Sequence, residues 1–410
     1  MKKVRKDGKG MLLHKGETYL KNKKLYCFSY TDVLGKRRFV YATDLVELRK
    51  KEENYLRNKL DKLDTYLIAC ADINYVFDKY LSTRTDLRST TKTHYCYTYN
   101  KYVRGGFGKK KIADVHFTDV FCYYKGLMER KVGISSIGEI NKLLSSTFRL
   151  ALRDNTIRSN PTIGIMPELR KKYGTESGIR HALTIEQERT FLNILEEPGY
   201  LRWKPMFTFM FGTGCRIGEV IGLRWSDVDF DKGIININHS ITYGSRVDKK
   251  NRVEFEVNKP KTEAGLRCIP ILDKVKEALL LEKKNQIEYG YHPIVEIGGM
   301  SGFIFCNRFG YIHNAQTVNK EIHRIVDKYN ASEELKAKRE GREPFLLPRF
   351  SCHIIRHTFC SRLCENETNI KVIQTIMGHK DIQTTLNIYA EVSEMKKKEI
   401  FRDLNHDKIF

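Results

Sequence analysis

The sequence predicts a multidomain protein that is mainly α-helical and carries small antiparallel sheets. Its 410 residues are enough for two or three domains, and 41% of them are hydrophobic, which is sufficient for real cores. Alternating, strand-like segments gather near the N-terminus and over residues 234–271, while most of the remainder lacks strand alternation. We therefore expect a small N-terminal domain of sheet plus helix, a helical bundle, and a mixed α/β domain.

The first expected domain, residues 1–64, is strongly basic, with 18 Lys and Arg against 9 Asp and Glu. Three strands are predicted, at Thr18–Leu20, Leu25–Tyr30 and Arg38–Ala42. The Asp-x-x-Glu pattern of Asp44 and Glu47 then predicts a helix that runs past Lys62. A small basic sheet supported by one helix can lay its strands in a DNA groove. The alternative is a basic surface hairpin with no specific partner.

Residues 73–165 are predicted to form a helical bundle. Helices are expected around 76–80, over 90–103, from about 117, and over 137–154. The glycine-rich segment 105–111 has no lysine followed by Ser or Thr, as a nucleotide-binding loop requires, so a turn is predicted there. Asn160-Pro161 ends the bundle, and residues 166–180 are predicted to be a linker.

Residues 181–410 are predicted to form one mixed α/β domain with a C-terminal tail. A capping box at Thr184–Gln187 opens its first helix. An apolar helix over 201–211 stops at Gly212-Thr-Gly214, and Arg216 begins the next helix. Strands are then expected at Ile234–Ile241, Val253–Val257 and Arg267–Ile271, followed by a mostly helical chain.

Charge and cysteine content narrow the class of partner and of site. The net charge of +23 favours a polyanionic partner, most commonly nucleic acid. The 10 cysteines include no CxxC pair, so zinc is not expected and a reducing cytoplasm fits. Asp227, Asp229 and Asp231 alternate as in a calcium loop, yet Lys232 stands where an EF-hand needs glycine. Neither the cysteines nor these aspartates therefore predict a metal site. No segment has the length of a signal-peptide core or a membrane span, so no membrane association is expected.

Four pieces of the sequence carry side chains suited to holding and attacking a phosphodiester. They are Gly212-Thr-Gly-Cys-Arg216-Ile-Gly-Glu219, the bend Pro260-Lys261-Thr262, the pair His353 and Arg356, and Gly378-His379 followed by Tyr389. His353 and Arg356 are three apart on one helix face, and Ser351 can cap that helix. A helix start with an arginine and a histidine beside it is an anion site, and a tyrosine further on suggests that the anion is attacked.

This ordered set resembles the catalytic signature of the tyrosine recombinase (phage integrase) family, from about residue 178 onward. The bundle at 73–165 resembles the core-binding domain of that family. The basic N-terminal unit resembles the arm-binding domain of lambda-like and conjugative-transposon integrases. Two departures are small: Met377 stands where the family often has Leu, and Glu391 where it often has His.

The chemistry assigns a role to the cationic side chains. Attack on a phosphodiester crowds negative charge onto its non-bridging oxygens, and preorganised positive charge stabilises that state. Arg216 and Arg356 would clamp these oxygens, since guanidinium forks suit phosphate. His379 would donate a further hydrogen bond to the same oxygens, while Glu219 would orient Arg216.

Tyr389 would attack the phosphorus and form a phosphotyrosyl enzyme. A phenol has a pKa of about 10, so it needs a base, and His353 is the candidate, acting as the acid in the reverse step. By resemblance, Lys261 protonates the leaving 5′ hydroxyl. Neither a metal nor any other cofactor is expected, because arginines supply the charge and the phosphotyrosine keeps the bond energy.

The resemblance implies a site-specific recombinase (integrase) that works through a 3′-phosphotyrosyl intermediate and integrates or excises a mobile element or prophage. The implied partners are double-stranded DNA at core and arm sites, a homotetramer on DNA, and DNA-bending or excision proteins. A bacterial or phage-encoded cytoplasmic protein is implied. The tail 393–410 is expected to dock on a neighbouring protomer, or else on its own domain. Alternatives are a type IB topoisomerase and a DNA-binding regulator that has lost catalysis.

Overall fold

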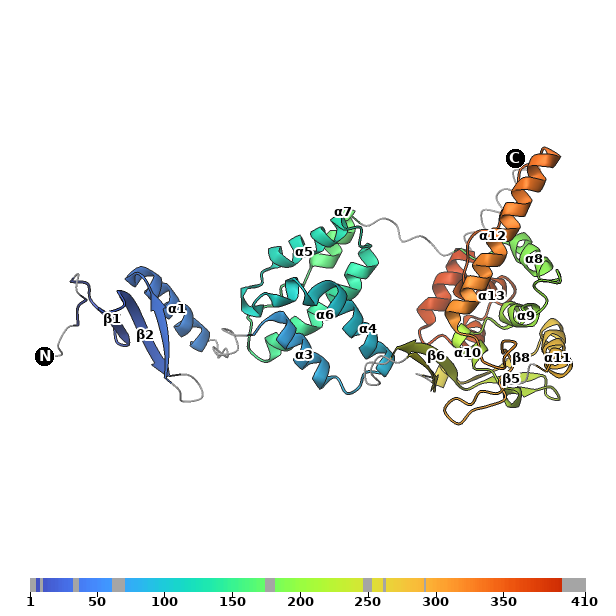
Figure 1. Cartoon of the computed structure of the whole chain (residues 1–410), viewed down its shortest axis with the longest axis horizontal. Helices are drawn as coiled ribbons and strands as arrows, with labels where there is room; N and C mark the ends of the chain where they lie inside the picture. Colours follow the sequence, from blue (N-terminus) through green and yellow to red (C-terminus); the bar gives the residue numbers. More distant parts are fainter. Residues whose placement is uncertain are drawn as a thin grey trace. The chain divides into compact units, whose positions relative to one another are not determined.

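The computed structural model describes residues 5–7, 10–31, 37–60, 71–173, 181–245, 253–260, 263–290 and 293–392. The chain divides into two compact units, one of Met1–Ser177 and one of Gly178–Ser245 with Asn251–Phe410. Each unit has its own hydrophobic cores and is treated by itself below; Figure 1 gives the element labels. Lys261, Thr262 and the tail 393–410 lie outside the described residues.

The first unit begins with an antiparallel sheet and a helix packed on one of its faces. Strands β1 (Glu17–Leu20), β2 (Leu25–Thr31) and β3 (Arg37–Ala42) pair in that order, and α1 covers Leu45–Leu60. All three predicted strands are confirmed. Leu45 and Leu48 of α1 pack with Tyr26 and Phe28 of β2 in a small core. Because strand residues alternate between faces, the exposed Arg37, Phe39 and Tyr41 of β3 lie on the face away from the helix.

The rest of the first unit is the expected helical bundle. Its helices are α3 (Ile73–Thr83), α4 (Ser89–Tyr99), α5 (Phe117–Glu129), α6 (Ile134–Arg153) and α7 (Ile165–Tyr173), with one π-helical turn at Asn100–Arg104. The prediction of a linker from residue 166 is wrong up to residue 173, because this segment forms α7. Only Ile165, Met166 and Leu169 of α7 are buried, so its periodicity is too short to stand out among the charged residues.

The second unit packs helices around two small antiparallel sheets. One sheet has the order β4 (Val228–Asp229), β5 (Ile234–Ile237), β8 (Arg267–Pro270), and the other pairs β6 (Ser240–Ser245) with β7 (Val253–Asn258). The single strand expected at 234–241 is therefore two strands in different sheets. Between them lies the buried His239, whose Nε2 hydrogen-bonds the carbonyl oxygen of Gly222 at 2.6 Å and whose Nδ1 contacts Asn238.

The helices of this unit follow the sequence closely. They are α8 (Ile185–Ile194), α9 (Lys204–Thr213), α10 (Ile217–Ile221), α11 (Asp273–Glu288), α12 (Ala315–Glu340), α13 (Cys352–Asn366), α14 (Ile370–Met377) and the helical residues 382–392. The capping box before α8 is confirmed, since Gln187 N donates to Thr184 Oγ1 at 3.1 Å and Thr184 N donates to Gln187 Oε1 at 3.0 Å.

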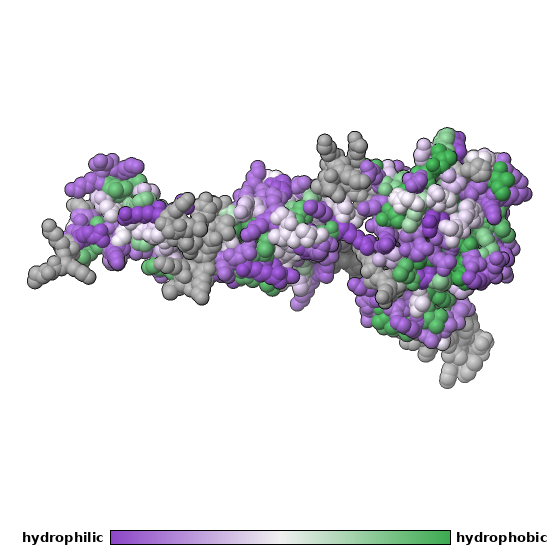
Figure 2. Space-filling model, turned by 90° about the horizontal axis from the view of Figure 1, so that it is seen from below, coloured by the Kyte–Doolittle hydropathy of each residue, from purple (hydrophilic) through white to green (hydrophobic). Residues whose placement is uncertain are grey.

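No helix in the described ranges combines the length and apolar character needed to cross a bilayer. Figure 2 shows hydrophilic residues over much of the visible face, with hydrophobic patches scattered among them. The apolar side chains gather instead in the cores. The largest core of the second unit includes Phe191, Phe207 and Phe209 from α8 and α9, all of them fully buried.

One buried carboxyl group of this unit, that of Glu282, has its pKa raised by burial although it hydrogen-bonds Asn285 on the same helix. Glu282 of α11 is 3% exposed and lies near Arg202 and Cys306. Burial raises the pKa of Glu282 to about 7, and the charge of Arg202 only partly opposes that shift. The folded protein therefore favours the protonated carboxyl, whereas the unfolded chain ionises near pH 4.5. The resulting destabilisation grows as pH rises from about 4.5 to about 7.

We expect Glu282→Gln to raise the free energy of unfolding at pH 8 by about 3 kcal/mol and to change it little at pH 5. The glutamine keeps the shape of the protonated acid and cannot ionise. Urea denaturation at several pH values measures the difference. Glu277→Gln, exposed on the same helix, is the control and should show no such pH dependence. A difference between Glu282→Gln and the unsubstituted protein that is constant from pH 5 to pH 8 would contradict the raised pKa.

Candidate active site

Arg216 is positioned by the break between two helices. Gly214 ends α9 in the left-handed conformation (φ 59°), and a Cβ there would lie 2.3 Å from a ring carbon of Phe359. Arg216 is the N-cap residue of α10, as predicted. Its Nη1 donates to Glu219 Oε1 at 3.0 Å, and its Nη2 donates to the carbonyl oxygen of Gly378 at 2.8 Å. The side chain remains 44% exposed, so a ligand can reach it.

Arg356 lies one turn into α13 and is only 4% exposed. Its Nη1 donates to the carbonyl oxygen of Gly214 at 2.8 Å, and its Nη2 donates to that of Met377. The two arginines therefore meet at the same pair of turns, the one after α9 and the one after α14. Burial, followed by the charge of Arg216, lowers the pKa of Arg356 to about 10. An anion bound here would reduce the repulsion between the two guanidinium groups.

His379 follows the second of these turns and is buried, with 7% of its surface exposed. Its Nδ1 hydrogen-bonds Thr385 Oγ1 at 2.9 Å. Burial, together with the charges of Arg356 and Arg216, lowers the pKa of His379 to about 4, so the ring is neutral at neutral pH. In the tautomer that carries its proton on Nε2, the hydroxyl of Thr385 donates to Nδ1 and the Nε2–H is left to donate to a phosphate oxygen.

A buried ion pair lies beneath these groups. Arg267 of β8, with 1% of its side chain exposed, donates from Nη2 to Glu219 Oε2 at 2.7 Å and from Nη1 to Glu219 Oε1 at 3.1 Å. Its Nε donates to the carbonyl oxygen of Ile376 at 2.8 Å. Burial alone would raise the pKa of Glu219, but the hydrogen bonds and charge of Arg267, with Arg216, hold it at about 2. Glu219 therefore stays ionised and fixes both arginines.

The tyrosine helix is tied to this centre through its first turn. Tyr389 lies on the helical residues 382–392, is half-buried, and packs against a cluster that includes Ile373 and Met377 of α14. Thr385 stands four residues before Tyr389, one turn away on the same helix. The Thr385–His379 hydrogen bond therefore links the candidate nucleophile's helix to the turn that both arginines hold.

His353 lies in the first turn of α13, as expected, and is exposed. It is close enough to His379 to contribute to the lowered pKa of that ring. Ser351 is the N-cap residue of α13, but its side chain makes no capping hydrogen bond, so that part of the prediction is wrong. Lys261, the remaining predicted site residue, lies outside the described residues.

The structure thus brings Arg216, Arg356 and His379 together directly and connects Tyr389 and His353 to them. Sequence reasoning missed Arg267 and Thr385. Arg267 stood at an inward position of a predicted strand, alternating with the exposed Cys268, and a charged residue at such a position was the available signal. Thr385 carried no signal, since a lone threonine within a helix is common.

One group of described side chains has the spacing to hold a metal ion: His14, Glu17 and Glu52 of the N-terminal sheet domain. Glu17 is fully buried and accepts a hydrogen bond from Arg49 Nε at 3.1 Å, with a further one from His14 N at 2.6 Å. Arg49 balances the carboxylate of Glu17, whereas burial and the neighbouring charge of Glu17 raise the pKa of Glu52. The cluster belongs to a different unit from the arginine centre.

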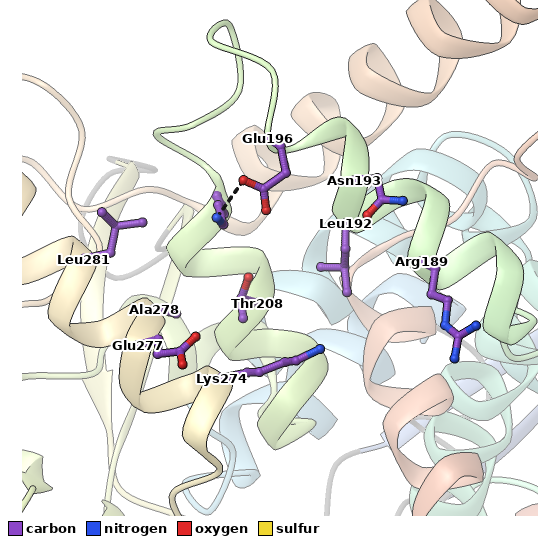
Figure 3. A pocket seen from close by; sticks show the side chains of 10 residues that line it. Arg189, Leu192, Asn193, Glu196, Thr208, Lys274, Glu277, Ala278 and Leu281 are labelled. Carbon is purple, nitrogen blue, oxygen red and sulfur yellow. Dashed lines mark hydrogen bonds and ion pairs between the residues drawn. The ribbon is translucent and has the colours of Figure 1, made fainter.

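A separate pocket lies between α8, α9 and α11, with a volume of about 310 Å³ (Figure 3). Its wall combines the ion pair of Lys204 and Glu196, 2.7 Å apart, with Arg189, Lys274 and Glu277. Charges of both signs lie side by side there, and none of the predicted site residues lines it. The pocket is therefore not the anion site.

Comparisons with known proteins cover the whole chain. A family model described as the phage integrase family matches residues 181–396, and one described as the DNA binding domain of Tn916 integrase matches residues 1–67. The chain is 27% identical to the transposase from transposon Tn916 of Enterococcus faecalis over 424 aligned positions, which cover 100% of this chain and 98% of that protein. It is 28% identical, with the same coverage, to the transposase from transposon Tn1545 of Streptococcus pneumoniae.

Two solved structures resemble the fold. The Tn1549 transposon integrase, in complex with a circular intermediate DNA, aligns with a TM-score of 0.69 and 26% identity over 81% of this chain and 100% of that chain. The lambda integrase tetramer bound to a Holliday junction aligns with a TM-score of 0.54 and 18% identity over 90% of this chain and 93% of that chain. The latter shows a likeness of fold alone.

Arg267→Ala is expected to lower the free energy of unfolding of the second unit by about 3–5 kcal/mol, because it leaves the carboxylate of Glu219 buried without its main partner. Arg349→Ala is the matched control, since Arg349 forms an ion pair with Asp327 at 2.8 Å on the surface of the same unit. The control should cost less than about 1 kcal/mol. Chemical denaturation of both variants measures the contrast, and equal losses would contradict the role of the buried pair.

Proposed function

Because the chain belongs to the phage integrase family, we propose which of its residues carry out the strand exchange of a tyrosine recombinase: Arg216, Lys261, His353, Arg356, His379 and Tyr389. The chain is an integrase of the transposon-encoded kind, and its partner is DNA. The observation that carries the residue assignment is the meeting of Arg216 and Arg356 at the turns beside the buried His379.

The arginines act by electrostatic stabilisation. A guanidinium has five N–H donors in a plane, and the carbonyl contacts described for Arg356 use two of its nitrogens to orient the group. The scissile phosphate enters beside the 44% exposed Arg216 and accepts hydrogen bonds from both side chains. His379 Nε2–H donates to the same oxygens. Each donor is held before the DNA arrives, so little reorganisation is needed as negative charge develops.

The transfer conserves the phosphodiester. The hydroxyl of Tyr389 gives its proton to His353 as its oxygen attacks the phosphorus, and the bond from phosphorus to the 5′ oxygen breaks. Lys261 protonates the departing 5′ oxygen. In the reverse step the 5′ hydroxyl of another strand gives its proton to Lys261 and attacks the phosphotyrosine, the bond from phosphorus to the phenolic oxygen breaks, His353 returns the proton to that oxygen, and the DNA is sealed. Each step breaks one phosphoester bond and forms another, so no nucleotide cofactor is consumed.

We also propose how the chain is organised on DNA. Residues 1–64 grip arm sites, residues 73–173, which include α7, bind the core site together with residues 181–410, and residues 174–180 connect them. The separate hydrophobic cores and the separate match of residues 1–67 support this division. The active form is a homotetramer on paired core sites in the bacterial cytoplasm, helped by DNA-bending or excision proteins, with the tail 393–410 docked on a neighbouring protomer.

Tyr389→Phe is expected to abolish covalent DNA–protein product on a nicked suicide duplex that carries the target site, while DNA binding persists. The phenyl ring keeps the packing against the cluster that includes Met377 but has no oxygen to attack phosphorus. Denaturing gel electrophoresis measures the product. Tyr243→Phe, at an exposed tyrosine of the same unit, should form it normally. Joining of strands from two duplexes, rather than relaxation of one plasmid without site preference, separates a recombinase from a topoisomerase. Covalent product from Tyr389→Phe would contradict the assignment.

Arg37→Ala is expected to weaken binding of arm-site DNA and to reduce the slope of log affinity against log salt by about 1, the loss of one phosphate contact. Arg37 lies on the open face of the N-terminal sheet with Phe39 and Tyr41. Lys50→Ala, on the exposed side of α1, removes the same charge from the helix and should leave the slope unchanged. Fluorescence anisotropy over a series of salt concentrations measures both. Equal changes in the two variants would contradict binding through the sheet.

A further inference from the structure

Glu391 stands two residues after Tyr389 on the same helix, and its carboxylate faces two histidines. Its Oε1 lies 3.3 Å from Nδ1 of His181, and its Oε2 lies 3.9 Å from Nε2 of His357. His181 is the first described residue of the second unit, and His357 belongs to α13. One carboxylate therefore bridges the tyrosine helix to two segments that are far apart in sequence.

The bridge is placed where it can orient the nucleophile. The inner face of helix 382–392 carries Thr385, Ile388, Tyr389 and Val392, at the i, i+3, i+4, i+7 spacing. Glu391 projects from the flank of that face, about 100° away from Val392. The helix thus has one polar anchor before Tyr389, the Thr385–His379 hydrogen bond, and a second one after it. One anchor on each side of Tyr389 fixes both the position and the rotation of the helix.

The second anchor contacts the residue next to Arg356. His357 is the immediate neighbour of Arg356, and its side chain is only 14% exposed. Glu391 is 28% exposed, so this contact is more sheltered from solvent than the contact to His181, whose side chain is 71% exposed. At 3.9 Å Glu391 and His357 are too far apart for a hydrogen bond, so they attract each other as an ion pair when the ring is protonated. Glu391 therefore connects the helix of Tyr389 to the residue next to Arg356.

We propose that Glu391, held between His181 and His357, is a positioning residue for DNA cleavage by this enzyme. The clasp fixes the Tyr389 helix against α13 so that the phenol is delivered to the clamped phosphate. Integrases often have a histidine at this position. This chain has a carboxylate there, and the histidines lie on the segments that the carboxylate contacts. The proposal rests on the proposed role of Tyr389 as nucleophile.

The test separates cleavage from binding. Single-turnover formation of covalent product on a nicked suicide duplex gives the cleavage rate, and fluorescence anisotropy gives the affinity for the same DNA. Glu391→Gln keeps the size of the side chain and removes its charge; we expect cleavage about tenfold slower, with unchanged affinity and unchanged thermal midpoint. Glu334→Gln, exposed on α12, is the control and should cleave at the original rate. A cleavage rate for Glu391→Gln equal to that of the control overturns the proposal.

A swapped pair supplies the rescue. The double variant Glu391→His with His181→Glu restores an attractive contact to residue 181 but sets two histidines against each other at 357, so we expect its cleavage rate to recover in part and to exceed that of either single variant. Failure of this rescue in a protein with the original thermal midpoint, or parallel losses of affinity and stability in Glu391→Gln, overturns the positioning role. Either result leaves Tyr389 as nucleophile intact, because only covalent product from Tyr389→Phe contradicts that assignment.

Discussion

The ion pair between Glu219 and Arg267 is the interaction on which the candidate active site depends. It is almost fully buried and connects α10, the last strand of a sheet, and the last turn of α14. Three guanidinium groups, those of Arg216, Arg267 and Arg356, lie around this one carboxylate. The carboxylate makes their proximity tolerable without neutralising them. The result is a compact cationic centre whose charges are set by the fold before any substrate is present.

The backbone at the C-terminal ends of α9 and α14 also orients the arginines. Both α9 and α14 end at a glycine in the left-handed conformation, Gly214 and Gly378, and a Cβ on Gly378 would approach Ala264 O within 2.9 Å. The carbonyl groups at these two helix ends accept the hydrogen bonds of Arg216 and Arg356. Helix C-termini carry partial negative charge, so they suit cations. Two helix ends therefore orient the arginines while leaving Arg216 partly open to the solvent.

Sequence patterns predicted much of this arrangement because each pattern was local. Strand alternation gave β1 to β3, a capping box gave the start of α8, and the Gly-Thr-Gly step placed Arg216 at the start of α10. What escaped prediction depends on contacts between distant segments. Arg267 finds Glu219 across 48 residues, the strand at 234–241 divides because His239 turns inward to Gly222, and α7 is helical because three apolar side chains reach the bundle core. No short stretch of sequence records such partners.

The lowered pKa of Arg356 has a thermodynamic consequence. A guanidinium that loses basicity through burial and a cationic neighbour is held under mutual repulsion, which Glu219 offsets only in part, and the second unit bears the remaining cost until an anion binds. Any anion that enters relieves it, and a ligand that binds only the folded state stabilises that state. The scissile phosphate is thus a structural component as well as a reactant: the domain reaches its most stable form with its substrate in place.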